Sequence, residues 1–189
     1  ANDVSVYAGT TNFNVQDPNT QYRSVPNLAD IKIHTQYNPS TLNNDISVIR
    51  LAQPLSLNSY VATIPMASSS VTLSSLQGQT AVASGWGKVS DSTNSITNDL
   101  RYVDLVIENH QTCKNYYIAG LVNDGVICAN TAGGARSTCN GDSGGPLKYG
   151  NALIGVTSFV SAAGCQSGGP DGFTFVPKFR GWINQHTGI

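Results

Sequence analysis

A glycine-rich run that contains one serine is the segment of this sequence best suited to carry out chemistry. The run reads Cys139-Asn140-Gly141-Asp142-Ser143-Gly144-Gly145-Pro146-Leu147. Glycines allow the dihedrals and the close backbone approach of a tight turn, so the Ser143 hydroxyl would point outward as a nucleophile. Such a turn also aims backbone N–H groups at one point, where they would stabilise an oxyanion in acyl transfer. The alternative is an ordinary turn, because Gly-Asp and Gly-Gly pairs are common turn formers.

A serine nucleophile needs a base to take its proton, and the base works best when a buried carboxylate orients it. The candidate carboxylate is Asp45, which follows Asn43-Asn44 and precedes an apolar run that ends at Leu51. Turn-forming asparagines before an apolar run place the acid at the mouth of a buried strand. The alternative is an Asx turn that caps the strand. Together with the downstream glycine-rich run, however, Asp45 matches the His, Asp, Ser chain order of one known triad.

The composition excludes several classes of function. The chain has 189 residues, of which 40% are apolar, enough for one large or two small domains. A net charge of -1 with only 11% charged residues argues against nucleic-acid binding and against a polybasic membrane patch. No apolar run approaches the length of a membrane span. The sequence opens on Ala1 without a signal segment, so we expect that processing, or the choice of boundaries, removed what came before.

The four cysteines predict disulfide bonds rather than a metal or redox site. They are Cys113, Cys128, Cys139 and Cys165, and no two of them form a C-x-x-C pair. Their even number, in a chain rich in Ser, Thr, Asn and Gly, indicates an extracellular protein. The sequence alone leaves three pairings open.

The elements that would position these residues are mostly strands. Short β-rich runs between turn signals predict an antiparallel sandwich or barrel, over Val4–Ala8, Ile46–Leu51, Thr80–Ser84, Arg101–Ile107 and Ala152–Phe159. Two segments are candidate helices. One is Asn109–Tyr117, and the other follows Val176-Pro177 and has Phe179, Trp182 and Ile183 on one face. A stretch with prolines, serines and few charges, Ala52–Gln79, is the expected linker.

With these motifs, the chain resembles the chymotrypsin-like serine endopeptidases, and within them the arthropod brachyurins, insect collagenases and chymotrypsins. The resemblance covers essentially the whole chain and implies an all-β fold of two antiparallel six-stranded barrels with a C-terminal helix. We expect residues 1–60 to be the remainder of the first barrel, 61–176 the second barrel and 177–189 the helix. The supporting segments, besides the glycine-rich run, are Asn44–Leu51, Ser84–Gly87, Leu100–Leu105, Thr157–Val160 and Gln185–Ile189.

The sequence departs from this family at the general base. Counting back from Asp45 by the family's spacing passes the start of the chain, so the histidine segment and about half of the first barrel are expected outside it. They would be a separate chain of a nicked enzyme, a disordered segment, or a part that this sequence leaves out. The chain's own His34, His110 and His186 are interpreted as ordinary surface or half-buried histidines.

The resemblance implies that the N–H groups of Gly141 and Ser143 form the oxyanion hole. It also implies two further features of the nucleophile loop. It implies the disulfides Cys113–Cys128 and Cys139–Cys165, the second of which would brace this loop against a wall of the substrate pocket. It further implies that Asp142 pairs with the new amino terminus that activation cleavage of a zymogen creates. Ala1 aligns too far downstream to be that terminus. The alternative role of Asp142 is to shape the turn.

Five residues are implied as the substrate pocket. Ser137, six positions before the nucleophile, would form a neutral floor, and Asp171 would lie at the back unless it only serves a Pro-Asp-Gly turn. Ser158, Phe159 and Val160 would line the neck and pair with an extended substrate. Val160 replaces the glycine of most relatives, so we expect a narrower entrance. In Gly9–Ser24, which corresponds to a loop that binds calcium in some relatives, only Asp17 is acidic, too few ligands for a calcium site.

The predicted function is a secreted, extracellular serine endopeptidase that uses a Ser-His-Asp triad and an acyl-enzyme. We expect broad chymotrypsin-, elastase- or collagenase-like specificity, no cofactor, protein or peptide substrates, the missing N-terminal segment as a partner, and protease inhibitors as possible ligands. The rival interpretation is an inactive protease homologue or fragment that acts as a binding module. Such homologues usually lose the serine or its glycines, and this sequence retains both.

Overall fold

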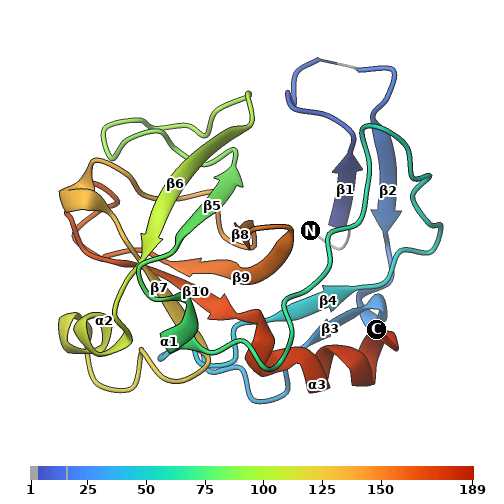
Figure 1. The fold of residues 1–189 in the computed structure, drawn as a ribbon. Helices are drawn as coiled ribbons and strands as arrows, with labels where there is room; N and C mark the ends of the chain where they lie inside the picture. Colours follow the sequence, from blue (N-terminus) through green and yellow to red (C-terminus); the bar gives the residue numbers. More distant parts are fainter. Residues whose placement is uncertain (1–3, 16) are drawn as a thin grey trace.

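A closed six-stranded barrel and two small sheets make up the fold (Figure 1). The structure is a computed structural model that describes residues 4–15 and 17–189. The strands of the barrel follow one another in the order β10-β7-β6-β5-β8-β9, and every pairing is antiparallel. They are β5 (Thr80–Gly85), β6 (Arg101–Ile107), β7 (Val126–Asn130), β8 (Pro146–Tyr149), β9 (Ala152–Phe159) and β10 (Asp171–Phe175). This barrel confirms the second of the two barrels that the sequence predicts.

Alternating side chains fill the interior of the barrel. In β5, Ala81 and Ala83 are buried, and in β6 Leu105 and Ile107 are buried, while the residues between them are more exposed. A strand that has one face toward a core requires this alternation. Phe173 of β10 belongs to the same cluster of buried residues and is 0% exposed. The core of the molecule therefore lies inside the barrel.

The other half of the chain holds two two-stranded sheets. β1 (Val4–Ala8) pairs with β2 (Gln21–Val25), and β3 (Ile31–Ile33) pairs with β4 (Ser47–Ile49). Several large apolar side chains remain exposed here, among them Tyr7 (54%), Tyr22 (50%), Ile33 (62%) and Ile49 (42%). Residues 52–72 contain no strand or helix and connect this half to the barrel, where the sequence predicts a linker (Figure 1).

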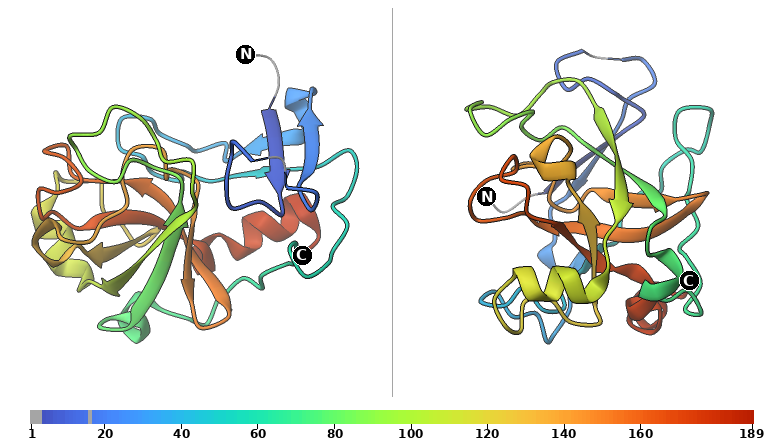
Figure 2. Two further views of the ribbon diagram at one scale, coloured as in Figure 1. Left: turned by 90° about the horizontal axis from the view of Figure 1, so that it is seen from above. Right: turned by 60° about the vertical axis from the view of Figure 1, so that its left-hand side comes forward.

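Three α-helices flank these sheets: α1 (Leu73–Leu76), α2 (His110–Tyr116) and α3 (Val176–Thr187). The Asn109 side chain caps α2 by accepting from Thr112 N at 3.0 Å. α3 has Pro177 in its first turn and ends at Gly188, whose φ is 77°. From the barrel, α3 runs to below β3 and β4 (Figure 1), and the view from above shows it extending toward the side of the molecule that holds β1 and β2 (Figure 2). Two 3-10 turns, η1 (Leu28–Asp30) and η2 (Ala132–Gly134), complete the described elements.

Both helices that the sequence predicts are confirmed, and so are the strands β1, β6 and β9 with the predicted bounds. The predicted strand over Ile46–Leu51 is longer than β4, because only Ser47–Ile49 pairs with β3. The remaining short elements were not predicted from the sequence. β2 is polar, β10 contains a glycine, and α1 is a single capped turn, so none has a clear hydrophobic period. The missed elements are β2, β3, β7, β8, β10 and α1.

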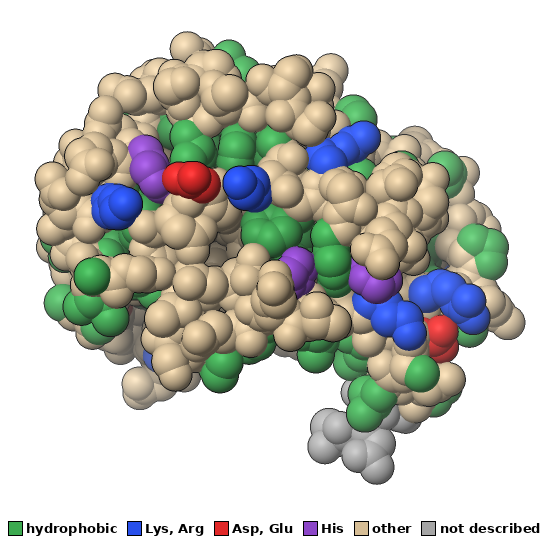
Figure 3. All heavy atoms as spheres, turned by 90° about the horizontal axis from the view of Figure 1, so that it is seen from below, with side chains coloured by type: hydrophobic (Ala, Val, Ile, Leu, Met, Phe, Trp, Pro, Cys, Tyr) green, Lys and Arg blue, Asp and Glu red, His purple; other side chains and the backbone are tan. Residues whose placement is uncertain are grey.

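Charged side chains of both signs are intermingled on the face drawn in Figure 3. This distribution agrees with the small net charge of the chain. Among the described residues, no helix is long and apolar enough to span a bilayer.

Candidate active site

The loop that carries Ser143 is a tight turn between the barrel strands. Gly141 and Gly144 have φ values of 101° and 83°, which side chains rarely tolerate. Gly145 N donates to Asp142 O at 2.8 Å, and Gly144 N donates to Thr157 O at 2.9 Å. Thr157 belongs to β9, so this strand holds the turn in place. Ser143 is exposed at the tip of the turn.

The carboxylate of Asp142 accepts hydrogen bonds from the backbone of two segments, the loop after β5 and the start of the nucleophile loop. Its Oδ1 accepts from Gly87 N at 2.8 Å, and its Oδ2 accepts from Cys139 N at 2.9 Å. A Cβ added to Gly85 or Gly87 would lie 2.1–2.5 Å from this carboxylate, so the two glycines make room for it. Asp142 also lines a cavity of about 170 Å³ with Ser84, Lys88, Val103, Ser137, Thr138 and others. Among the residues that the structure describes, Asp142 has no cationic partner, and Ala1 lies outside them.

Asp45 is held at the start of β4 by contacts with the barrel. Its Oδ2 accepts from Ser158 Oγ at 2.7 Å, and its backbone carbonyl accepts from Thr174 Oγ1 at 2.6 Å. Asn44 has a φ of 57°, a conformation that asparagine tolerates better than most residues and that turns the chain into Asp45. β9 and β10 thus fix an acid that belongs to the other half of the chain. Ser158 is predicted for the pocket neck, and the sequence carries no local signal for its hydrogen bond to Asp45.

A cavity of about 350 Å³ lies beside the nucleophile loop. Ser143 and Ser158 both line it, and Ser158 bonds to Asp45, so the acid contacts a residue of the cavity wall. Phe159 and Val160 also line the cavity, and their place in a pocket neck stays a prediction. The remaining lining residues are Cys139, Asn140, Thr157, Ser161, Ala162 and Gly164.

Packing fixes the ring of Phe159. A Cβ added to Gly172 would lie 2.2 Å from this ring, so the ring lies directly over the glycine. The ring of Tyr117 meets it edge-on, with centroids 5.1 Å apart and planes at 86°. The wall of the cavity at Phe159 is therefore set by β10 and by the residue that caps the end of α2.

Ser137 and Asp171 bond to one another and are not among the residues that line this cavity. Ser137 Oγ donates to Asp171 Oδ1 at 2.8 Å, and Thr138 donates to Oδ2 from N at 2.6 Å and from Oγ1 at 3.0 Å. Asp171 is 1% exposed. Burial raises the pKa of Asp171 to about 6, although the hydrogen bonds from Thr138 and Ser137 oppose this rise. The proposed contact of these two residues with a substrate stays a prediction.

The three histidines have other environments. The His34 ring packs against Phe179 and Trp182, at centroid distances of 5.7 and 5.2 Å, and its Nδ1 accepts from Gln36 N at 3.2 Å. His186 packs against Trp182 at 4.8 Å. His110 is half-buried, and desolvation lowers its pKa. In the described part of the chain, no histidine hydrogen-bonds to Asp45 or Ser143.

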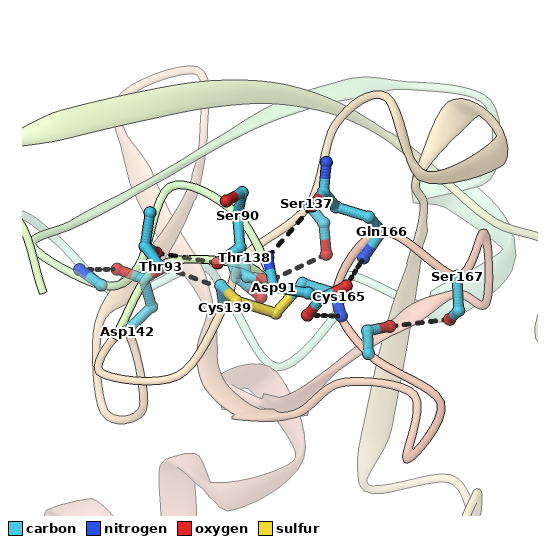
Figure 4. The surroundings of a disulfide bond; sticks show 12 residues. Ser90, Asp91, Thr93, Ser137, Thr138, Cys139, Asp142, Cys165, Gln166 and Ser167 are labelled. Carbon is cyan, nitrogen blue, oxygen red and sulfur yellow. Dashed lines mark hydrogen bonds between the residues drawn. A yellow bond between two sulfur atoms is a disulfide. The ribbon is translucent and has the colours of Figure 1, made fainter. Parts of the chain in front are cut away.

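Both disulfides have the pairing that the resemblance implies. Cys113 of α2 pairs with Cys128 of β7. Cys139, at the start of the nucleophile loop, pairs with Cys165, which follows β9 (Figure 4). The Asp91 carboxylate lies near the second disulfide, but sulfurs in a disulfide are not thiolate ligands, so this group is not a metal site. In the Gly9–Ser24 segment, Asp17 Oδ1 accepts two 2.8 Å hydrogen bonds from Asn19.

Comparisons with known proteins agree with this geometry. Residues 1–183 match the sequence profile of the family described as Trypsin. Brachyurin from Leptuca pugilator is 44% identical over 160 residues, which are 85% of this chain and 68% of brachyurin. Serine protease 1 from Drosophila melanogaster is 42% identical over 171 residues, 89% of this chain and 62% of the relative. Collagenase from Hypoderma lineatum is 38% identical over 169 residues, 88% of this chain and 62% of the relative.

A solved structure of HL collagenase matches the fold, with a TM-score of 0.86 and 33% identity. The match covers 99% of this chain and 77% of the collagenase chain. The chain spans about two thirds of the length of the curated relatives named above. From the barrel, the nucleophile loop and these matches together, we conclude that the chain belongs to the trypsin family of serine endopeptidases.

Proposed function

We propose that the native protease, meaning the protein that carries these 189 residues, cleaves peptide bonds with Ser143 as nucleophile and Asp45 as the acid of a Ser-His-Asp triad. One observation carries this proposal: Ser158 donates to Asp45 at 2.7 Å and lines the same cavity as Ser143. A carboxylate in this position can orient a histidine and stabilise its imidazolium. The histidine itself is contributed by a segment outside these 189 residues.

The reaction has two balanced steps. In the first, the histidine takes the proton of Ser143 Oγ, the oxygen attacks the substrate carbonyl, and the N–H groups of Gly141 and Ser143 stabilise the oxyanion. The C–N bond breaks, the histidine returns the proton to the leaving amine, and an ester remains on Ser143. In the second step, water replaces the amine, and hydrolysis of the ester releases a carboxylic acid.

Asp142 is the activation residue in this proposal. Its carboxylate lines the 170 Å³ cavity, where Lys88 and the backbone of the neighbouring loop are also found. A protonated amino terminus, released by cleavage of a zymogen, would enter this cavity and pair with the carboxylate. Because Asp142 immediately precedes Ser143, this ion pair would order the oxyanion loop.

The substrate pocket is the 350 Å³ cavity, and its specificity is broad. Its walls are apolar at Phe159 and Val160 and polar at Ser158 and Ser161, which suits a medium-sized apolar side chain. The neutral Ser137 and the buried Asp171 argue against strict selection of Arg or Lys. Protein and peptide substrates, and inhibitors that imitate them, are the proposed partners; two disulfides support an extracellular location.

Site-directed variants of the native protease test the assignment. Ser143→Ala should abolish hydrolysis of a peptide p-nitroanilide, and Asp45→Asn should lower kcat by about 10⁴-fold, because the histidine loses its orienting partner. A fluorophosphonate probe should label the parent enzyme at Ser143 only. Full activity in Ser143→Ala, or labelling of a different serine, would overturn the assignment.

A further inference from the structure

The side chain of Asp91 joins two loops that both contact the nucleophile segment (Figure 4). Its Oδ1 accepts from Cys165 N at 2.9 Å, and its Oδ2 accepts from Gln166 N at 2.9 Å. In the opposite direction, Asp91 N donates to the side-chain Oε1 of Gln166 at 3.0 Å. Three hydrogen bonds therefore connect the loop after β5 to the segment after β9, and we call this set the Asp91 latch.

The chain around the latch is shaped to accept a carboxylate. Gly164 has a φ of 113°, and a Cβ at this position would lie 2.5 Å from Asp91 Oδ2. Any side chain at residue 164 would therefore displace the acid. The hydrogen bonds from Gln166 and Cys165 backbone lower the pKa of Asp91, so it is charged at neutral pH. Hydrogen bonds to an ionised acceptor are stronger than neutral ones.

The latch closes a ring around the reactive loop. At its other end, the loop that carries Asp91 contacts the nucleophile segment: Gly87 N donates to Asp142 Oδ1 at 2.8 Å, and Lys88 N donates to Asn140 O at 2.9 Å. The Cys139–Cys165 disulfide joins the nucleophile segment to the residue that Asp91 holds. Nucleophile loop, Asp91 loop and pocket wall are thus linked pairwise, by hydrogen bonds on two sides and a covalent bond on the third.

This ring includes residues of the proposed substrate pocket and residues beside the proposed oxyanion hole. Gly164 and Cys139 line the 350 Å³ cavity, so the residues held by Asp91 continue the wall of the pocket. Asn140 and Asp142 flank Gly141, a donor of the oxyanion hole. We propose that Asp91 is a positioning residue that fixes the pocket wall against the oxyanion loop; this proposal rests on the proposed protease function. Through Asp91, binding of the substrate side chain would be coupled to acylation.

The substitution Asp91→Asn tests this role, since the amide of Asn turns one acceptor oxygen into a donor that faces a backbone N–H. In the native protease, we expect kcat/KM to fall at least about tenfold for a substrate with Leu before the scissile bond, the scale of one charged hydrogen bond. For the matching substrate with Ala, which barely fills the pocket, we expect a loss within about threefold. Gln166→Ala, which removes only the bond from Asp91 N, should give the same trend at smaller size.

Active-site titration before each assay corrects for misfolded enzyme. A merely structural role that still affects the titrated enzyme would lower kcat/KM equally for both substrates. Asp104→Asn is the matched control, because Asp104 is exposed on β6. Amide hydrogen exchange gives a second readout that needs no activity: Asp91→Asn should speed exchange at Cys165 and Gln166 and leave β7 protected. Equal losses for Leu and Ala substrates, or unchanged exchange at the two amides, would overturn the proposal. An inactive parent enzyme with faster exchange in the variant would instead refute the protease function and keep the latch.

Discussion

Ser137 Oγ donates a 2.8 Å hydrogen bond to Asp171 Oδ1, so the residue predicted for the pocket floor bonds directly to the one predicted for its back. Thr138 occupies the second carboxylate oxygen with two further bonds. Because a buried carboxyl resists ionisation, Asp171 should stay protonated to a higher pH in the folded protein than in the unfolded chain.

The replacement Asp171→Asn should change how the free energy of unfolding depends on pH. In the folded protein, burial raises the Asp171 pKa to about 6 from the ordinary 3.8. The stabilisation from this group is therefore fully present below pH 3.8 and is lost as pH rises through about 6. Relative to the parent, the variant should gain about 3 kcal/mol between about pH 4 and about pH 7. Urea denaturation at these pH values measures the difference, and a constant difference would contradict the prediction.

Replacing Asp171 by glycine should selectively lower cleavage after Arg. Asp171 accepts a hydrogen bond from Ser137, the residue predicted for the pocket floor. Removal of its negative charge should therefore weaken the binding of basic substrate side chains and spare that of Leu. The measurement is the ratio of kcat/KM for Arg and Leu substrates of the native protease. A ratio that stays the same would show that Asp171 acts only within its own hydrogen-bond network.

The substitution Val160→Gly should raise the Phe-to-Leu ratio of kcat/KM. Val160 lines the cavity, and its branched side chain narrows the space for a large ring. Since steric differences of a few methyl groups change selectivity by about 1–3 kcal/mol, we expect a shift of roughly tenfold rather than an absolute switch. The parent enzyme should prefer Leu, with measurable cleavage after Phe and Arg. Exclusive cleavage after Arg and Lys in a substrate library would refute this description of the pocket.

Residues 1–189 alone should hydrolyse peptide esters no faster than background. The three histidines of the chain make no hydrogen bond to Ser143 or Asp45 in the described residues, so the serine has no base. Addition of the histidine-bearing segment, by co-expression or refolding, should restore turnover. Hydrolysis by the 189-residue chain that Ser143→Ala abolishes would contradict the prediction and point to another base.

Loss of the Cys139–Cys165 disulfide should reduce activity more than loss of Cys113–Cys128. The bridges span sequence separations of 26 and 15 residues, so loop-closure entropy predicts a similar stabilisation of about 3 kcal/mol for each. Only the first bridge joins the nucleophile loop to the pocket wall. Paired Cys→Ser variants, compared by melting temperature and by kcat/KM after active-site titration, separate the two effects. Equal loss of activity in both pairs would contradict this assignment.

Local sequence was sufficient for features that depend on neighbouring residues. The glycine positions around Ser143 predict a tight turn, and the structure has Gly141 and Gly144 at positive φ. A β-rich run between turn signals predicts β6 with its bounds, and Val176-Pro177 predicts the start of α3. These properties are set by backbone sterics and by hydrophobic period, which a short window of sequence contains.

The tertiary structure alone decided which distant residues meet. Ser158 bonds to Asp45 across 113 positions, and Asp91 reaches the amides of Cys165 and Gln166 across 74 and 75 positions. No local pattern encodes such pairs, because they depend on the order in which the barrel strands close and on where the loops between them cross. The sequence by itself determined the reactive turn, several strands and the protease family that the motifs resemble. The folded chain decided the partner of the acid, the burial of Asp171 and the ring of contacts around the nucleophile loop.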